Sequence, residues 1–187
     1  MRSNSIIYIL FICVMLASSM ICLAEDISGT SAANLTVPKE MLPEGFKLLA
    51  VLPEMDPHVN MTEYISDFYG ADDIGPAAVT VGIYQWGKPG EAYDAKVTLI
   101  QLQDEEHADA AISNYKSNPE FQKPPFVGVD RFASALINGH NATEIRKRVN
   151  GQTLRYLYLW RNGSTVVLVE GNGDLGKSRD LASATGL

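Results

Sequence analysis

Asn150-Gly151 and Asn162-Gly163, near the C-terminal end of the chain, constrain the fold more than any other feature of the sequence. Each dipeptide separates two strand-like runs, and asparagine and glycine tolerate the positive φ angles that tight type I′ hairpin turns require. Strands joined by such turns lie antiparallel. The sequence therefore predicts a C-terminal meander of four strands, which cover residues 131–137, 143–149, 152–160 and 165–170.

Alternation of apolar and polar residues predicts another hairpin upstream of this meander. Its strands cover residues 77–86 and 93–102, and its turn runs from Gly87 to Gly90. A short apolar run at 46–52 predicts one more strand. Strands are therefore expected to dominate the chain and to lie mostly antiparallel.

Two to three helices are expected beside these strands. Asp104 is placed to cap a helix that ends near Asn118, and a second helix is expected over residues 175–184. The segment from Asn60 to Gly70 fits a short capped helix, with a strand as the alternative. Helices added to a mostly antiparallel sheet define the α+β class.

A repeated order of elements raises the hypothesis of two pseudo-equivalent halves that share one sheet. The run 83–86, which ends in Tyr84-Gln85-Trp86, is followed by a turn, a strand and a helix. The run 157–160, which ends in Tyr158-Leu159-Trp160, is followed by the same order. A chance likeness is the alternative, because Tyr-x-Trp is a weak marker in any strand.

The N-terminal segment is typical of a secretory signal. Arg2 precedes an uncharged apolar run from Ile6 to Ala24, and Glu25 follows it. A basic start, an apolar centre and a small-residue end predict a signal peptide over residues 1–24 that is cleaved after Ala24. An uncleaved N-terminal anchor and a lipoprotein acylated at Cys22 are the alternatives. In all three cases the rest of the chain is expected outside the cytoplasm, secreted or at the cell surface.

Residues 25–37 are rich in Ser, Thr, Ala and Gly and predict a flexible tether. A single α+β domain is expected over residues 38–187. Both cysteines, Cys13 and Cys22, precede the cleavage site, so the processed chain is expected to form no disulfide and to depend on its apolar core. Cleavage leaves 163 of the 187 residues, a normal length for one domain.

The charge of the chain disfavours nucleic acid as a partner. The net charge is −7, and loss of the signal peptide removes one basic residue and no acidic one, which gives −8. A phosphate backbone would repel such a surface. A membrane contact is expected only through the N-terminal segment, if that segment stays uncleaved.

Aromatic residues form the one candidate ligand-binding face that the sequence offers. Alternation along two strands places Tyr84 with Trp86, and Tyr156 with Tyr158 and Trp160, on common faces. Such a strip could stack on a sugar or another flat ligand, or dock a partner protein. The alternative is that it forms the second covered face of a central sheet.

Four Asn-x-Ser/Thr tripeptides are candidate glycosylation sites. They begin at Asn34, Asn60, Asn141 and Asn162, which exceeds the roughly one that chance predicts for such a motif. The alternative is that Asn and Thr are simply common in turns. Asn162 in particular is expected at an exposed hairpin tip, where a bulky glycan would fit.

The sequence shows no motif that assigns a catalytic, cofactor or metal site. Gly171 to Gly176 matches the letters of a dinucleotide fingerprint, but the chain ends before the acidic residue that such a fold needs. The match predicts a strand-to-helix turn whose glycines serve positive φ angles. His58, His107 and His140 lack metal-ligand spacing, and no serine stands in a nucleophile elbow.

These observations predict an exported, non-catalytic domain that is ligand-binding, sensor-like or an interaction domain for an unknown ligand or surface protein, with no cofactor. A secreted hydrolase with a site assembled from scattered residues is the alternative.

Overall fold

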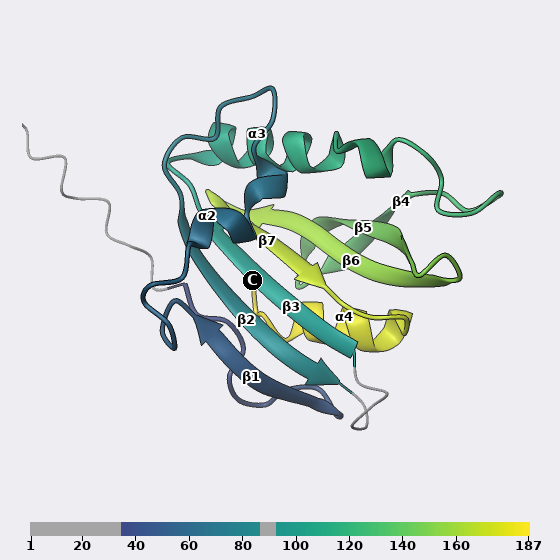
Figure 1. Ribbon diagram of the computed structural model, residues 1–187, viewed down its shortest axis with the longest axis horizontal. Coiled ribbons are helices and arrows are strands. Elements are labelled where there is room, and N and C mark those ends of the chain that lie inside the picture. The colour runs from purple at the N-terminus through teal and green to yellow at the C-terminus, as the bar shows by residue number, and fades with distance from the viewer. Residues whose placement is uncertain (1–34, 87–92) are drawn as a thin grey trace, which may run out of the picture. The chain divides into compact units, whose positions relative to one another are not determined.

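The computed structural model describes residues 35–86 and 93–187 (Figure 1). Seven strands form one sheet in the order β1-β2-β3-β7-β6-β5-β4, and each neighbouring pair is antiparallel. The strands are β1 (Phe46–Leu52), β2 (Ala78–Trp86), β3 (Tyr93–Gln101), β4 (Phe132–Ile137), β5 (His140–Val149), β6 (Thr153–Asn162) and β7 (Thr165–Glu170). The helices are α2 (Met61–Tyr64), α3 (Glu105–Lys116) and α4 (Leu175–Ser183), with 3-10 turns η1 (Ser66–Phe68) and η2 (Pro119–Phe121). The predicted α+β class is confirmed.

The predicted C-terminal meander is confirmed as strands β4 to β7. Strand β5 begins at His140 rather than at Thr143, because Asn138-Gly139 forms a further two-residue turn. These two residues have φ angles of +48° and +87°, which is the type I′ pattern. The same Asn-Gly signal that located the other hairpins therefore also marked this one.

The hairpin between β6 and β7 has the predicted position and a different turn type. Asn162 is exposed at the end of β6, as predicted, and the loop consists of Gly163 and Ser164. Of these two, only Gly163 has a positive φ, +57°, which is the type II′ pattern. At Asn150-Gly151 both φ angles are positive, +52° and +74°, so the predicted type I′ turn is confirmed there.

The predicted helices are confirmed, with small shifts in their ends. The Asn60 side chain accepts a hydrogen bond from Thr62 N at 3.2 Å and caps α2, so this segment is helical rather than extended. The Asp104 side chain caps α3 by accepting from His107 N at 2.9 Å. Both caps satisfy backbone donors that the first helical turn leaves unpaired.

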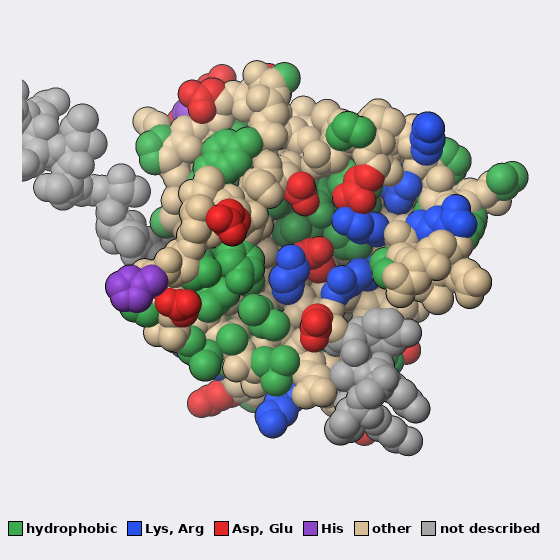
Figure 2. Space-filling model, in the orientation of Figure 1, with side chains coloured by type: hydrophobic (Ala, Val, Ile, Leu, Met, Phe, Trp, Pro, Cys, Tyr) green, Lys and Arg blue, Asp and Glu red, His purple; other side chains and the backbone are tan. Residues whose placement is uncertain are grey.

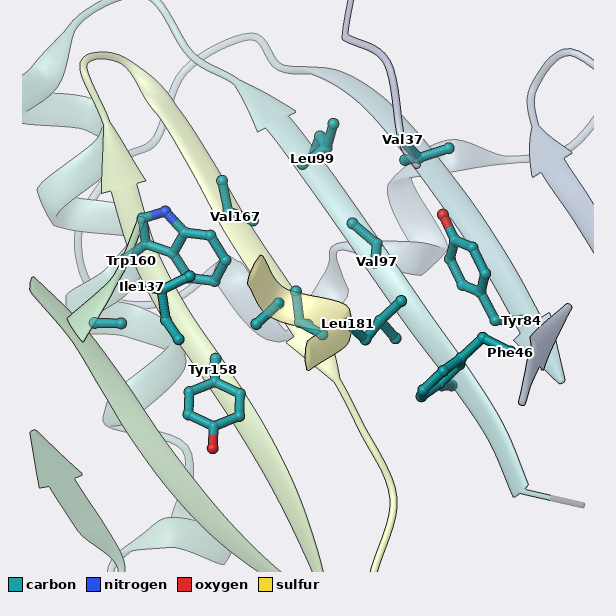
Figure 3. Packing of buried hydrophobic residues seen from close by; sticks show 14 of the residues in the cluster. Val37, Phe46, Tyr84, Val97, Leu99, Ile137, Tyr158, Trp160, Val167 and Leu181 are labelled. Carbon is teal, nitrogen blue, oxygen red and sulfur yellow. The ribbon is translucent and has the colours of Figure 1, made fainter. Parts of the chain in front are cut away.

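Helices cover both faces of the sheet (Figure 1). Alternate residues along each strand point to opposite faces, so the sheet has an apolar cluster on each face. We call the apolar cluster on one face the α3 core; it contains Ile65, Phe68, Ile100, Ala111, Tyr115, Ile145, Leu157, Leu159, Val166 and Leu168, among others. We call the cluster on the other face the α4 core; it contains Val37, Phe46, Tyr84, Val97, Leu99, Tyr158, Trp160, Val167, Val169 and Leu181, among others (Figure 3).

The order of the strands agrees with the hypothesis of two pseudo-equivalent halves, but the placement of the helices does not. Strands β1-β2-β3 and β5-β6-β7 lie on either side of the β3–β7 boundary, and Tyr84 of β2 and Tyr158 of β6 both face the α4 core. However, α3 packs on one face of the sheet and α4 on the other. If a two-fold axis normal to the sheet related the two halves, both helices would lie on the same face.

Charged residues occupy the part of the α3 face that the helices leave open. Figure 2 shows acidic and basic side chains gathered together over the middle of this face. Lys96 forms an ion pair with Glu170, and Lys147 forms one with Glu120 at 2.8 Å. Part-exposed pairs of this kind contribute about 1 kcal/mol or less each. They keep this area of the sheet compatible with water.

Several predictions fall on residues outside the described ranges. These are the signal peptide with both cysteines, residues 25–34 of the tether, Asn34, and the turn from Gly87 to Gly90. At the end of the predicted tether, Leu35 packs against the α4 core and Val37 is buried within it. In the described part of the chain, none of the helices has the length and apolar character needed to span a bilayer.

Candidate functional site

A cleft lies at the end of the sheet where its central strand stops short. Glu170, the last residue of β7, pairs with Lys96 of β3, so the beginning of β3 extends past β7. After Glu170 the chain continues beside β6, since Tyr156 N donates to Asn172 O at 3.0 Å and Gly171 N donates to Tyr156 O at 2.9 Å. The beginnings of β3 and β6 therefore flank an opening.

The cleft has a volume of about 890 Å³, within the range of roughly 300–1,000 Å³ that small-molecule sites occupy. It combines aromatic, aliphatic, polar and charged side chains. The lining residues are Trp86, Asp94, Phe126, Val149, Gln152, Thr153, Leu154, Arg155, Tyr156, Asn172, Gly173 and Asp174.

Arg155 holds the two sides of the cleft together. Its Nε donates a hydrogen bond to the carbonyl oxygen of Gly171 at 2.7 Å, and its Nη2 donates to the carbonyl oxygen of Asp94. Gly171 follows β7, and Asp94 belongs to β3. One guanidinium therefore replaces the backbone pairing that ends with β7, and it fixes the spacing of the cleft walls.

Asn172 is the one wholly buried residue among those that line the cleft. Its Oδ1 accepts a hydrogen bond from Asp174 N at 2.8 Å, and its backbone N donates to Ser178 Oγ at 2.9 Å. Its Nδ2 has no hydrogen-bond partner within the described ranges. A buried donor without a partner costs about 1–3 kcal/mol, so this amide carries an unsatisfied polar group.

The turn from Gly171 to Gly176 joins β7 to α4, as predicted, but for a different physical reason. Gly171, Gly173 and Gly176 do not adopt positive φ angles, so the predicted backbone role of these glycines is wrong. A Cβ on Gly171 would instead collide with the Ser178 side chain and lie 2.8 Å from the Tyr156 carbonyl oxygen. Glycine is required here because α4 and β6 approach the backbone closely.

The five residues of the predicted aromatic face separate into two groups. Tyr84, Tyr158 and Trp160 are each at most 1% exposed and lie in the α4 core, packed around α4 (Figure 3). These three residues therefore belong to a covered face of the sheet and not to an exposed ligand-binding strip. Trp86 and Tyr156 are only half-buried, and both line the cleft.

The buried tyrosines have structural roles. The Tyr84 hydroxyl donates to Pro38 O at 2.7 Å, and the Tyr158 hydroxyl donates to Glu144 Oε2 at 3.4 Å. Burial raises the pKa of both phenols well above the ordinary value, because it disfavours the charged phenolate. Neither hydroxyl is therefore suited to act as a base near neutral pH.

Arg146 and Arg148 have partners within the chain. Arg146 Nε donates to Glu144 Oε1 at 2.9 Å. Arg148 donates to Gly151 O and lies over the ring of Phe126, with 4.9 Å from the guanidinium carbon to the ring centroid. The second arginine thus fixes one of the aromatic rings of the cleft.

The histidines do not assemble a metal centre within the described residues, where no group of three or more suitable side chains occurs. His107 lines a smaller cavity of about 430 Å³ with Asp72, Asp73 and Glu106. Its Nδ1 lies 2.7 Å from Asp104 Oδ1, and this hydrogen bond raises the pKa of His107. The contact belongs to the cap of α3.

Three of the four candidate glycosylation residues are described, and all three are exposed: Asn60, Asn141 and Asn162. Asn60 is engaged in the α2 cap, where its Nδ2 also donates to Glu63 Oε1 at 3.1 Å. Asn141 lies on β5, and Asn162 lies at its hairpin tip.

Sequence reasoning missed Arg155, Asn172 and Phe126 as parts of a site. They come from a strand, a strand-to-helix turn and a loop, and no spacing in the sequence connects them.

Comparison of the chain with models of protein families, with curated proteins and with solved structures finds no match.

Proposed function

We propose that this chain is an exported, non-catalytic binding domain that holds a small ligand in the cleft between the beginnings of β3 and β6. The observation that carries the proposal is the buried Asn172, which lines the cleft and whose Nδ2 has no partner in the described chain. The half-buried rings of Trp86 and Tyr156 support it, because a few placed polar groups among apolar walls are typical of ligand sites.

Export is the second part of the proposal, and the N-terminal sequence supports it. Arg2 and the apolar run that ends at Ala24 match a signal peptide, and an uncleaved anchor would place the domain on the same side of the membrane. Fractionation of tagged cells tests this part. The domain is expected outside the cytoplasm, with Glu25 as the new N-terminus if cleavage occurs, and recovery in the cytoplasm with Met1 retained contradicts it.

Binding is tested by tryptophan fluorescence, because the two tryptophans have different environments. Trp86 lines the cleft, while Trp160 is buried in the α4 core. A library of small metabolites, sugars, nucleotides and peptides is titrated into the full chain. A saturable change in emission that Tyr156→Leu weakens supports the cleft as the site. A library without any saturable ligand contradicts the proposed binding function.

A secreted hydrolase is the second candidate, and one observation favours it. Asp94 and Asp174 both line the cleft, and paired carboxylates can serve as acid and base in hydrolysis. Product analysis after long incubation with any ligand that binds tests this candidate. Turnover that Asp94→Asn or Asp174→Asn abolishes by lowering kcat far more than it weakens binding would assign the cleft to an enzyme.

A further inference from the structure

The charges that line the cleft disfavour an anionic ligand. Among the described residues, its charged groups are the carboxylates of Asp94 and Asp174 and the guanidinium of Arg155. Both hydrogen bonds of Arg155 run to backbone carbonyl oxygens, and within residues 35–86 and 93–187 no carboxylate forms an ion pair with it. The chain as a whole carries −7. An anion would approach a negative protein and meet two carboxylates against one cation.

The polar groups of the cleft both donate and accept hydrogen bonds. Gln152 offers both donors and an acceptor, and Asp94 offers acceptors. The Thr153 hydroxyl donates to Val149 O at 3.2 Å and offers an acceptor, while Asp174, whose Oδ1 accepts from Lys177 N at 2.9 Å in the α4 cap, offers its second carboxylate oxygen. A ligand that only accepts would give the carboxylate of Asp94 no donor, and a simple cation would give the side-chain amide of Gln152 no acceptor. Hydroxyl groups on adjacent carbons satisfy both kinds of protein group.

Aromatic rings supply the apolar surface of the cleft. Trp86 packs against Phe46, whose ring centroid lies 6.3 Å away, and its indole also borders Gly45, where any Cβ would be only 3.2 Å from the Nε1 atom. Its ring is therefore fixed in place. Tyr156 contributes a second, half-buried ring from the opposite wall. Flat rings of this kind pack against the C–H face of a sugar ring.

Resting on the proposed binding function, we infer that the ligand of this cleft is a neutral saccharide. One sugar ring packs on Trp86 or Tyr156, an oxygen of the sugar accepts a hydrogen bond from the side-chain amide of Gln152, and hydroxyls donate to the carboxylates of Asp94 and Asp174. Gln152, Thr153 and Asp174 are exposed at the rim, so a longer chain can continue out of the cleft into solvent.

The test uses the full chain in a polyoxyethylene detergent, which carries no sugar headgroup. The neutral probes are cellotetraose, chitotetraose and mannotetraose; the comparison probes are tetragalacturonate, ATP and choline. Binding is followed by tryptophan fluorescence and by saturation-transfer NMR on the probe. At least one neutral tetrasaccharide is expected to bind in a saturable way, more tightly than tetragalacturonate, with transfer strongest to the C–H protons of one ring.

Variants connect binding to the cleft. Tyr156→Leu removes the ring and is expected to weaken binding about tenfold, whereas Tyr156→Phe keeps the ring and is expected to stay close to the parent. Gln152→Ala, an exposed change at the rim, is expected to weaken binding and serves if Tyr156→Leu fails to fold. Tyr69→Leu, an exposed aromatic outside the cleft, is the matched control and is expected to have no effect.

The outcomes separate the two levels of the proposal. Binding of ATP or choline without any neutral saccharide overturns the saccharide inference and leaves the binding function standing. Saccharide binding that neither Tyr156→Leu nor Gln152→Ala weakens overturns the assignment to this cleft. Absence of binding by every probe overturns the inference, and the wider library then decides the binding function.

Discussion

The hydroxyl of Tyr84 donates a 2.7 Å hydrogen bond to the carbonyl oxygen of Pro38, and both residues are buried. Tyr84 lies two residues before the end of β2, whereas Pro38 follows the segment predicted to be a tether. The ring of Tyr84 lies over Gly82, where a Cβ would approach the hydroxyl to 2.6 Å. This bond, with Val37 in the α4 core, fixes the start of the folded domain to the sheet.

We expect Tyr84→Phe to destabilise the domain by about 1–2 kcal/mol, because the Pro38 carbonyl would stay buried without its donor. Urea denaturation followed by circular dichroism measures the effect. Tyr69→Phe, at an exposed position, is the control and should leave the midpoint unchanged. An unchanged midpoint for Tyr84→Phe would show that another donor reaches Pro38.

Gly171→Ala and Gly176→Ala should change the stability of the fold in opposite directions. At Gly171 a Cβ meets Ser178 and the backbone of β6, so we expect a loss of about 1–3 kcal/mol. At Gly176 the nearest atom would be Asp174 Oδ1 at 3.4 Å, and alanine in this helical position should gain up to about 1 kcal/mol. Thermal melting of the two variants side by side gives the comparison, and equal melting temperatures would refute the close-packing argument.

His107 and Asp104 should couple the α3 cap to pH. The hydrogen bond to Asp104 raises the pKa of His107, and the hydrogen bonds from His107, its backbone N–H first, lower the pKa of Asp104. A raised histidine pKa stabilises the fold below the unfolded value, near 6.5, and this contribution is lost as the pH rises through the folded pKa. The lowered pKa of the Asp104 carboxyl stabilises the fold above the unfolded value, which is about 4, and this contribution is lost as the pH falls through the folded pKa.

Asp104→Asn isolates this charge effect, because asparagine caps helices about as well as aspartate. We expect the pKa of His107 to fall in this variant, measured by NMR titration of its ring protons, while α3 stays folded. A titration curve for His107 that is the same in both proteins would refute the coupling.

The sequence predicts the sheet better than it predicts the site. Asn-Gly dipeptides and period-two alternation depend only on local backbone geometry, so they locate the hairpins of β4 to β7 and the class of the fold. Turn type depends on more than the dipeptide. Asn162-Gly163 and Asn150-Gly151 share the same letters, yet the first loop shifts by one residue to Gly163-Ser164.

The cleft depends on tertiary structure that no local pattern records. Tyr156 and Tyr158 share a face in the sequence, but only Tyr158 lies beneath α4, while Tyr156 lies where β7 has ended. Where a neighbouring strand stops and which face a helix covers decide whether an aromatic side chain is core or site. The same holds for Asn172, whose importance comes from its burial beside an opening.

Arg155 supplies the last prediction, since its guanidinium bridges the carbonyl oxygens of Gly171 and Asp94 across the cleft. Arg155→Met keeps much of the apolar stem and removes both hydrogen bonds. We expect a loss of about 1–3 kcal/mol in unfolding free energy, because each bond from a charged donor contributes about 1.5–3 kcal/mol and water replaces part of it at this half-buried position.

The start of β3 should also separate from β6 in this variant, which exposes the half-buried Trp86 without affecting Trp160 in the core. Acrylamide should therefore quench a larger share of the tryptophan emission than in the parent protein. Lys147→Met, which removes an ion pair on the open part of the α3 face, is the matched control and should leave quenching unchanged. Equal quenching in Arg155→Met and the parent would mean that backbone packing alone fixes the width of the cleft.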